Sequence, residues 1–264
     1  MDEASLRLAL AGIPLGGMRY YESLGSTNEA ALAWAGEGAP DLALVYTEEQ
    51  TSGRGRAGRS WFSRRGAALA FSLLLRPDPG NQWALPRLTA LGALAVVEAL
   101  PPLHLTGEIK WPNDVLIDGR KVAGILTEMD GSGPQRVVVL GVGVNLNSRL
   151  EDFPAELRDK AGSLCLASGA PVDRARFTGR LLGALEARYE VWQRDGFASI
   201  AAAWRRLTPL LGRRIRVQEP GAVVEGTVID LSDDGALRLR LADGAEHRVI
   251  AGDVSLIGAD ATRD

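Results

Sequence analysis

The sequence contains very little cysteine: Cys165 is the one thiol in 264 residues. A single cysteine cannot form an internal disulfide, so a disulfide-stabilised secreted scaffold is excluded and a reducing cytoplasm is expected. Apolar runs of the roughly 18 uninterrupted residues that span a membrane are also missing. The acidic start, Met-Asp-Glu, lacks the basic segment of a signal peptide. We therefore expect a cytoplasmic protein with no membrane partner.

An excess of positive charge is missing as well. The chain has 30 basic and 33 acidic residues and a formal net charge of −3. This balance argues against an electrostatic grip on nucleic acid as the main activity. Hydrophobic residues make up 46% and charged residues 24%, as in ordinary globular proteins. The length suits one large domain with a smaller one.

The first 210 residues mix strand and helix patterns. The sequence Ser-Thr-Asn-Glu at 26–29 precedes an alanine-rich run, which predicts a capping box opening a helix. Asp118-Gly119 is a strong hairpin turn signal. Hairpin-linked strands among helices predict an α+β fold over a mixed sheet. The expected strands are 42–46, 67–75, 115–117, 121–129 and 136–144, and the expected helices are 83–100, 174–194 and 197–207.

The pattern changes after Pro209. Short alternating runs follow, separated by turn sequences such as Pro220-Gly221 and Asp243-Gly244. That spacing is typical of a small all-β barrel. The sequence therefore predicts two domains, residues 1–210 and 211–264. The expected strands of the second domain are 213–218, 223–231, 236–241 and 247–250.

Residues 53–59 read Gly-Arg-Gly-Arg-Ala-Gly-Arg and contain G-x-G-x-x-G, the dinucleotide fingerprint. The context disagrees with a Rossmann loop, because a strand rather than a helix is expected after it. Glycines let a backbone fold closely around a ligand, and guanidinium groups bind carboxylate and phosphate. A loop that closes around an anion is one interpretation. A solvated basic loop and an RNA contact remain open at this point.

A second cluster lies near the hairpin. Residues 110–114 read Lys-Trp-Pro-Asn-Asp, residues 121–126 read Lys-Val-Ala-Gly-Ile-Leu, and residues 141–147 read Gly-Val-Gly-Val-Asn-Leu-Asn. Taken singly, these residues have ordinary interpretations. A lysine in a strand usually faces solvent, an asparagine after an apolar run is often a turn residue, and a tryptophan usually lies in the core or at its rim.

Taken together, these segments strongly resemble the biotin–protein ligase family, in order and approximate spacing, from about residue 23 to 257. The resemblance implies a mixed-sheet catalytic domain of the biotin/lipoate ligase type and a small C-terminal SH3-like β-barrel. Some members carry an N-terminal helix-turn-helix domain and act as repressors. Because the Ser-Thr-Asn motif already begins at Ser26, the resemblance is to the monofunctional type, and no specific DNA binding is expected.

The resemblance implies ATP-dependent activation of biotin to biotinyl-5'-AMP and transfer to a specific lysine of a biotin carboxyl carrier protein, an acetyl-CoA carboxylase subunit or similar. Biotin and ATP would be substrates, and Mg²⁺ the activator. The first step brings two anions together, so it needs cations and donors. The implied catalytic residues are Lys121, Arg56, Lys110 and Asp114. The implied biotin-binding residues are Ser26, Thr27, Asn28, Gln50, Gly53, Arg54, Gly55, Arg56, Lys121 and Gly124. The implied ATP- and adenylate-binding residues are Arg56, Arg59, Trp61, Lys110, Asn113 and Asn145.

Several points stay open at the level of sequence. They include the metal ligands, the residue that deprotonates the acceptor lysine, the acceptor's identity, and the oligomeric state, a homodimer included. A lipoate–protein ligase is the nearest alternative, since its adenylate chemistry is similar. An RNA-binding protein is the alternative from another class, although the acidic charge and the lack of aromatic RNP-type motifs count against it. We also predict that residues 53–59 are mobile in the empty protein and ordered around its ligand.

Overall fold

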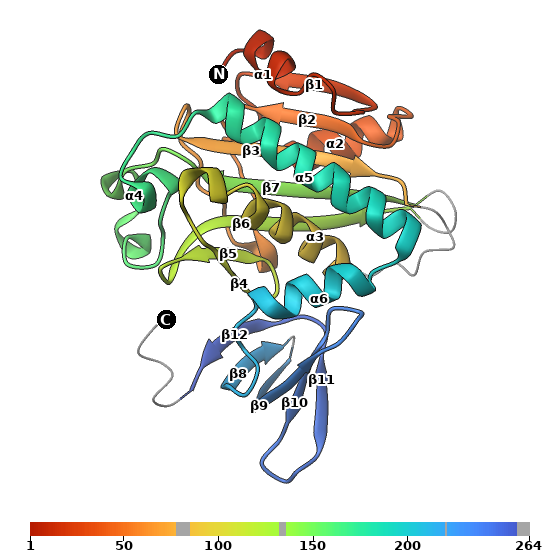
Figure 1. Cartoon of the computed structure of the whole chain (residues 1–264), viewed down its shortest axis with the longest axis vertical. Helices are drawn as coiled ribbons and strands as arrows, with labels where there is room; N and C mark the ends of the chain where they lie inside the picture. Colours follow the sequence, from red (N-terminus) through yellow and green to blue (C-terminus); the bar gives the residue numbers. More distant parts are fainter. Residues whose placement is uncertain (78–84, 132–135, 220, 258–264) are drawn as a thin grey trace.

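The computed structural model describes residues 1–77, 85–131, 136–219 and 221–257. A seven-stranded mixed sheet with helices on both faces forms the larger part, and a five-stranded sheet lies below it in Figure 1. The α+β prediction is therefore confirmed. In the described residues no helix is both long enough and apolar enough to span a membrane.

The large sheet joins one parallel edge pair to a run of antiparallel strands. Strands β1 and β2 pair in parallel. The other neighbouring strands of this sheet pair antiparallel. The order across the sheet is β1 (Gly17–Tyr21), β2 (Ala43–Thr47), β3 (Ala68–Leu75), β7 (Val137–Asn145), β6 (Arg120–Asp130), β5 (Asp114–Ile117) and β4 (Glu108–Lys110). The hairpin turn is as predicted, since Asp118 and Gly119 both have positive φ, at 50° and 75°.

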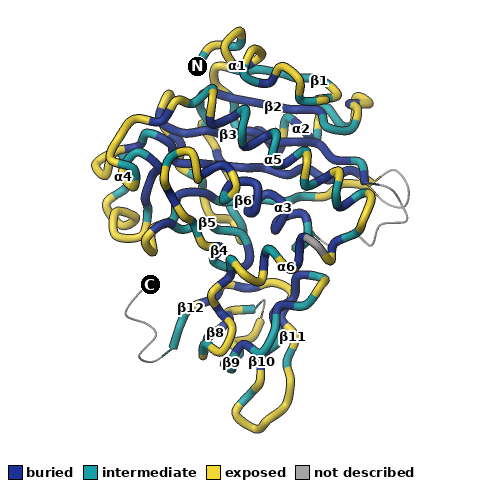
Figure 2. The backbone as a smooth tube through the Cα atoms, in the orientation of Figure 1, coloured by how far each residue is buried: buried dark blue, intermediate teal, exposed yellow. Residues whose placement is uncertain are grey.

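Alternation along the central strands explains why helices cover both faces. Side chains in a strand point alternately to either face, and every residue of β3 is buried. Val45 and Val139 pack with Ala31 of helix α2 (Thr27–Gly36). The neighbouring residues of the same strands face the main core, which holds α3 (Leu85–Glu98) and α5 (Arg174–Asp195). Figure 2 shows the resulting buried centre.

Three further helices complete the large part. Helix α1 (Glu3–Ala9) packs against α5, and α4 (Leu164–Ser168) is short. Helix α6 (Ala198–Leu207) leads to the small sheet. This sheet is antiparallel throughout, and it agrees with the prediction of a small all-β part. Its order is β11 (Glu246–Val249), β10 (Leu237–Arg240), β9 (Ala222–Leu231), β8 (Arg214–Glu219) and β12 (Asp253–Leu256).

Some sequence expectations need correction. The predicted capping box does not form: Ser26 is the N-cap residue of α2, but its side chain makes no capping hydrogen bond. The backbone N–H of Thr27 instead donates to Gln50 Oε1 at 2.9 Å, because the loop after β2 folds back over the helix start. The expected helix start at residue 83, Pro220 and the chain after residue 257 lie outside the described residues. The sequence patterns did not indicate α1, β1, α4, β4 or β12.

Candidate active site

One cavity gathers most of the residues that the sequence singled out. It encloses about 620 Å³ above strands β6 and β7. The start of α2, the loop 50–62, the segment 110–114 and the segment 153–161 form its walls. The small sheet also reaches it, through Asp253, Val254 and Ser255 of β12. The cavity thus lies where the large sheet, the glycine–arginine loop and the small sheet meet.

Glycines form the floor of the cavity. Gly124 of β6 is the register partner of Gly143 of β7, and the indole of Trp61 rests on both. A Cβ added at Gly143 would lie 2.4 Å from Trp61 Cε2, and one at Gly141 would lie 2.2 Å from Asn28 Oδ1. Side chains at these positions would therefore collide with Trp61 and Asn28, two residues that line the cavity.

One end of the cavity is a neutral hydrogen-bonding network. Gln50 Oε1 accepts from both the backbone N–H and the hydroxyl of Thr27, at 2.9 and 3.1 Å. Ser72 Oγ lies 2.8 Å from Thr27 Oγ1 and 2.6 Å from Asn28 Oδ1. In the described part of the chain, Gln50 Nε2 has no acceptor, so it is left to donate to a ligand. Sequence reasoning missed Ser72, although a serine inside the apolar run 68–75 signals a buried polar group that needs partners.

The other end carries positive charge. Arg56 is half-buried, its Nη1 donates to Asn113 Oδ1 at 3.2 Å, and Asn113 Nδ2 donates to Ile125 O at 3.1 Å. Burial lowers the pKa of the Arg56 guanidinium below its ordinary value, because desolvation disfavours the charged form. A bound anion would compensate for that desolvation. Arg59 donates to the Arg56 carbonyl at 3.2 Å and to Asp253 at 2.6 Å.

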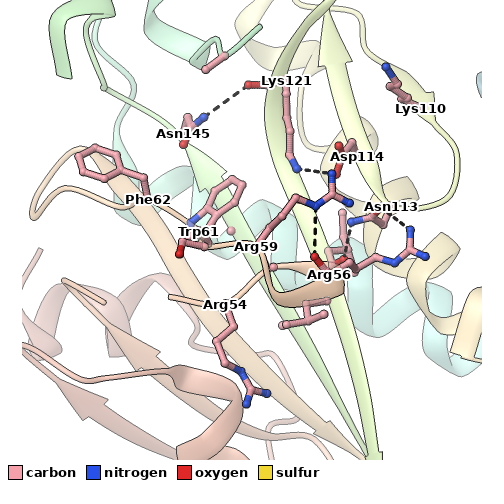
Figure 3. A pocket seen from close by; sticks show the side chains of 18 of the residues that line it. Arg54, Arg56, Arg59, Trp61, Phe62, Lys110, Asn113, Asp114, Lys121 and Asn145 are labelled. Atoms are coloured by element: carbon pink, nitrogen blue, oxygen red, sulfur yellow. Dashed lines mark hydrogen bonds and ion pairs between the residues drawn. The ribbon is translucent and has the colours of Figure 1, made fainter. Parts of the chain in front are cut away.

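Lys121 lies between the two ends. Its Nζ is 2.7 Å from Asp114 Oδ1 and 5.5 Å from the centroid of the Trp61 ring (Figure 3). The segment 157–162 fixes the Lys121 backbone, because Lys121 N donates to Lys160 O and Gly162 N donates to Lys121 O. Asn145 Nδ2 secures the same segment through Gly162 O at 2.9 Å. The Lys121 side chain therefore lies in the cavity wall, with about one third of it exposed.

Two of the expected residues stand apart from this group. Lys110 contributes to the cavity wall, but Figure 3 shows its side chain directed away from Lys121 and Asp114. Arg54 also lines the cavity, yet its guanidinium extends to the opposite side from Arg56 and Arg59. Trp111, the core tryptophan of the second motif, is 1% exposed and donates to Gly235 O of the small sheet at 3.0 Å.

Sequence reasoning did not find the segment 153–161 or β12. Both line the cavity, through residues such as Phe153, Leu157 and Asp253. Their patterns are those of ordinary loops and surface strands, so only the fold reveals their place. Within the described ranges, no group of three or more His, Cys, Asp or Glu side chains is arranged to hold a metal ion.

A cavity with neutral donors at one end and cations at the other suits a ligand with a polar head and an anion. Fold and cavity together define an α+β protein with one cavity that combines neutral hydrogen-bonding groups and cations. Residues 20–145 match the Biotin/lipoate A/B protein ligase family, and residues 210–257 match the Biotin protein ligase C terminal domain.

Several characterised proteins are similar along almost the whole chain. The biotin--[acetyl-CoA-carboxylase] ligase of Mycobacterium tuberculosis is 39% identical over 96% of this chain and 95% of its own length. The bifunctional ligase/repressor BirA of Bacillus subtilis is 36% identical over 97% of this chain and 79% of its own length. The structure of the Aquifex aeolicus biotin protein ligase with biotin and ATP has a TM-score of 0.78 at 26% identity, covering 92% of this chain and 99% of that chain.

The chain belongs to the biotin/lipoate A/B protein ligase family, in its biotin protein ligase branch.

Proposed function

We propose that this protein is a biotin–protein ligase. It joins biotin to ATP as biotinyl-5'-AMP, releases pyrophosphate, and transfers the biotinyl group to a lysine of a biotin carboxyl carrier protein. The observation that carries the proposal is a cavity that places the neutral network of Thr27 and Gln50 at one end and Arg56 and Lys121 at the other. Biotin has the matching parts, a neutral ureido ring and a carboxylate.

The neutral end supports binding of the ureido ring. That ring presents two N–H donors and one carbonyl acceptor. Gln50 Nε2 and the Ser26 hydroxyl can serve these groups, while Thr27 holds the Gln50 amide in place. Asn28 already uses its amide inside the protein, since Nδ2 donates to Leu126 O at 3.2 Å. We therefore assign Asn28 to holding the pocket wall, and Gly124 to leaving room for the ligand's body.

The cationic end supports the chemistry. In the first step a biotin carboxylate oxygen attacks the α-phosphorus of ATP, and the bond to pyrophosphate breaks. Arg56 and Lys121 are placed to reduce the repulsion between the two anions. We propose that Trp61 packs against the adenine, while Arg59, Lys110, Asn113 and Asn145 complete the nucleotide site, and that the backbone of Gly53, Arg54 and Gly55 closes over the intermediate.

In the second step the acceptor amine attacks the acyl carbon, and the bond to the AMP oxygen breaks. The attacking nitrogen must lose a proton. Asp114, paired with Lys121 at 2.7 Å, is the carboxylate placed to accept it or to orient the amine. Lys121 then stays beside the departing phosphate. In this sequence of steps Asp114 and Lys121 each have a role, and neither side chain needs to move.

Mg²⁺ fits the donors available. It prefers oxygen ligands and is commonly held by one or two carboxylates together with substrate phosphates. Asp114 and the amide oxygen of Asn113 would supply oxygen donors in the cavity wall, in addition to their contacts with Lys121 and Arg56. When bound, the ion would neutralise phosphate charge. This chain's own residues would then bind and orient the nucleotide around it.

We further propose that residues 1–210 form the catalytic domain and residues 211–264 a C-terminal SH3-like domain that completes the cavity. The separate five-stranded sheet that follows α6 supports this division, and the lining residues of β12 support the completion of the cavity. A reducing cytoplasm suits the single unpaired thiol of Cys165. The same proposal holds for a monomer or a homodimer, since one chain supplies every residue used above.

Mass spectrometry of an acceptor domain tests the function directly. The domain is incubated with the protein, ATP, Mg²⁺ and biotin, and in parallel with lipoate in place of biotin. We expect a mass gain of one biotinyl group on one lysine, and none with lipoate. A gain with lipoate alone would make the protein a lipoate ligase, and no gain with either would overturn the proposal.

A further inference from the structure

Arg54 is the first arginine of the glycine–arginine loop, and its guanidinium is held by two carboxylates. Arg54 Nη1 lies 3.1 Å from Glu29 Oε1 of helix α2, and Nη2 pairs with Glu128 Oε1 of strand β6. Figure 3 shows this side chain extending away from Arg56 and Arg59. Its charge is therefore used to attach the loop to the sheet and to α2.

Glu128 makes a second contact with its other oxygen. Glu128 Oε2 accepts from Asn28 Nδ2 at 2.7 Å, and Asn28 Oδ1 accepts from Ser72 Oγ at 2.6 Å. Ser72 Oγ also lies 2.8 Å from Thr27 Oγ1, and the Thr27 backbone N–H donates to Gln50 Oε1 at 2.9 Å. One line of hydrogen bonds thus runs from the loop arginine to the neutral end of the cavity. Glu128 is the carboxylate that joins its two halves.

We propose that Glu128 is a positioning residue that couples occupancy of the neutral end to closure of the glycine–arginine loop. The proposal rests on the proposed function and extends it to retention of the intermediate. A ligand that fixes Gln50 and Thr27 also fixes Asn28 and Ser72. A fixed Asn28 holds Glu128 in the one orientation that serves both Asn28 and Arg54. The loop is then held shut while the intermediate is present.

The construction of the loop supports this role. Internal bonds make residues 53–61 a compact unit: Gly55 N donates to Arg59 O at 2.7 Å, and Trp61 N donates to Gly53 O at 2.8 Å. Such a unit can move as one body about its few outside attachments. On one side these are Arg56 and Arg59, and on the other side Arg54 with its two carboxylates. Of the two carboxylates that hold Arg54, Glu128 is the one that also contacts Asn28, and through Asn28 the neutral end of the cavity.

Glu128→Gln is the variant of choice. Glutamine keeps one acceptor oxygen, so it can serve Asn28 or Arg54 but not both, and it removes the charge. Glu29→Gln is the matched control, because it also takes one carboxylate from Arg54 but leaves the line to Asn28 intact. The two measurements are the single-turnover rate of pyrophosphate release and the rate at which preformed biotinyl-5'-AMP leaves the enzyme.

We expect Glu128→Gln to speed adenylate release by about fivefold, which is the factor expected from the loss of one partly exposed ion pair. Pyrophosphate release should stay within about twofold of the wild-type rate, and Glu29→Gln should change adenylate release by less than about twofold. In a protein that already carries Arg54→Gln, the Glu128→Gln change should not alter the rate of adenylate release any further. Arg54, the partner of Glu128 in the loop, is already gone.

The outcomes separate cleanly. Wild-type release by Glu128→Gln, an equal effect of Glu29→Gln, or an additive effect on top of Arg54→Gln would each overturn the coupling. A variant that slows pyrophosphate release as much as it speeds adenylate release would overturn it too, because that pattern marks general damage to the site. If Glu128→Gln does not fold, Arg54→Gln alone must still speed adenylate release. If the wild type makes no adenylate, the proposed function itself fails.

Discussion

At the scale of single residues, Lys121 is the side chain on which the proposed chemistry depends most. It lies between Asp114 and the Trp61 ring, beside both predicted anions. We expect Lys121→Ala to keep the fold, because the side chain is one-third exposed. Adenylate formation should fall by a factor of about a hundred to a thousand, as for loss of one preorganised charge contact.

Pyrophosphate release measures this loss, and a thermal melt checks the fold. Arg7→Ala is a suitable control, because Arg7 pairs with Glu3 on an exposed helix away from the cavity. It should leave both the rate and the melt unchanged. A folded Lys121→Ala protein with a near wild-type rate would remove Lys121 from the mechanism.

Asn28 shows how the fold bears on a role that was predicted from the residue type and its motif. It belongs to the Ser-Thr-Asn motif, and its amide looks suited to a ureido ring. In the fold the amide is used by Leu126 O, Glu128 and Ser72. It is 3% exposed. Its position in the motif is therefore better explained by the support it gives to Thr27 and Gln50 than by direct contact with the ligand.

At the scale of elements, an ion pair joins helix α5 to the end of β2. Arg174 Nη1 lies 2.8 Å from Glu48 Oε2, and the two side chains are 10% and 5% exposed. Arg174 also donates to the Ala68 carbonyl at 3.1 Å. Burial alone would raise the pKa of Glu48, but the hydrogen bond from Arg174 helps to bring it below its ordinary value of 4.5.

A lowered folded-state pKa means that the ionised carboxylate stabilises the fold. That contribution is present above about pH 4.5 and is lost as the pH falls through the lower folded-state pKa. We expect Glu48→Gln to lower the free energy of unfolding by about 3–5 kcal/mol at pH 7, because it leaves the Arg174 charge buried without its partner. The variant should also lose part of the wild type's acid sensitivity.

Urea unfolding at pH 7 and between pH 3 and 5 measures both effects. Glu37→Gln is the control, since Glu37 pairs with Arg19 on the surface and should change the free energy of unfolding very little. Equal losses in the two variants would show that the α5–β2 ion pair does not hold these elements together.

The glycine–arginine loop is the element most open to a direct test of motion. We expect residues 53–59 to exchange amide hydrogens faster in the empty protein than with biotin or biotinyl-5'-AMP. The like charges of Arg56 and Arg59 repel, and a bound anion reverses this through bidentate hydrogen bonds. Arg56→Gly should still form the adenylate but release it, so that unrelated proteins nearby become biotinylated.

Hydrogen exchange across residues 50–61, with and without ligand, is the deciding measurement for the loop. An adenylate-release assay on Arg56→Gly accompanies it. Equal exchange in both states, together with wild-type retention by the variant, would remove the closing loop and leave the ligase assignment in place.

At the scale of the whole molecule, the two sheets share a core. Trp111, in the second sequence motif, donates to Gly235 O of the small sheet, and Trp204 of α6 is fully buried beside it. The active-site segment 110–114 is therefore anchored on the second sheet. We expect Trp111→Phe to lower the free energy of unfolding by about 1–3 kcal/mol, because the Gly235 carbonyl loses its buried donor.

The unfolding transition should stay single, since both sheets depend on this junction. Denaturant unfolding followed by tryptophan fluorescence and by far-ultraviolet circular dichroism tests both points. Two separate transitions, or no change in stability, would mean that the junction does not couple the sheets.

The sequence by itself determined the local features. Continuous apolar runs specified the central strands, because a strand buried on both faces must be apolar at nearly every position. Asp118-Gly119 specified the hairpin, because both residues must adopt positive φ. The motifs around Arg56 and Lys121 pointed to the family and to the cationic end of the cavity. In each case the required chemistry lies within a few consecutive residues.

The tertiary structure decided the contacts between distant segments. Glu128 and Asp253 carry no local signal, because a glutamate or an aspartate in a strand is compatible with many surroundings. Ser72, inside an apolar run, signals a buried polar group but does not say which partners it finds. Arg54 looked like a ligand-binding arginine, but the fold places Glu29 and Glu128 around it. The helix start at Ser26 looked self-capping, but Gln50 takes that role. Which partner a polar group finds depends on which segments the sheet brings together, and the spacing of residues along the chain does not encode it.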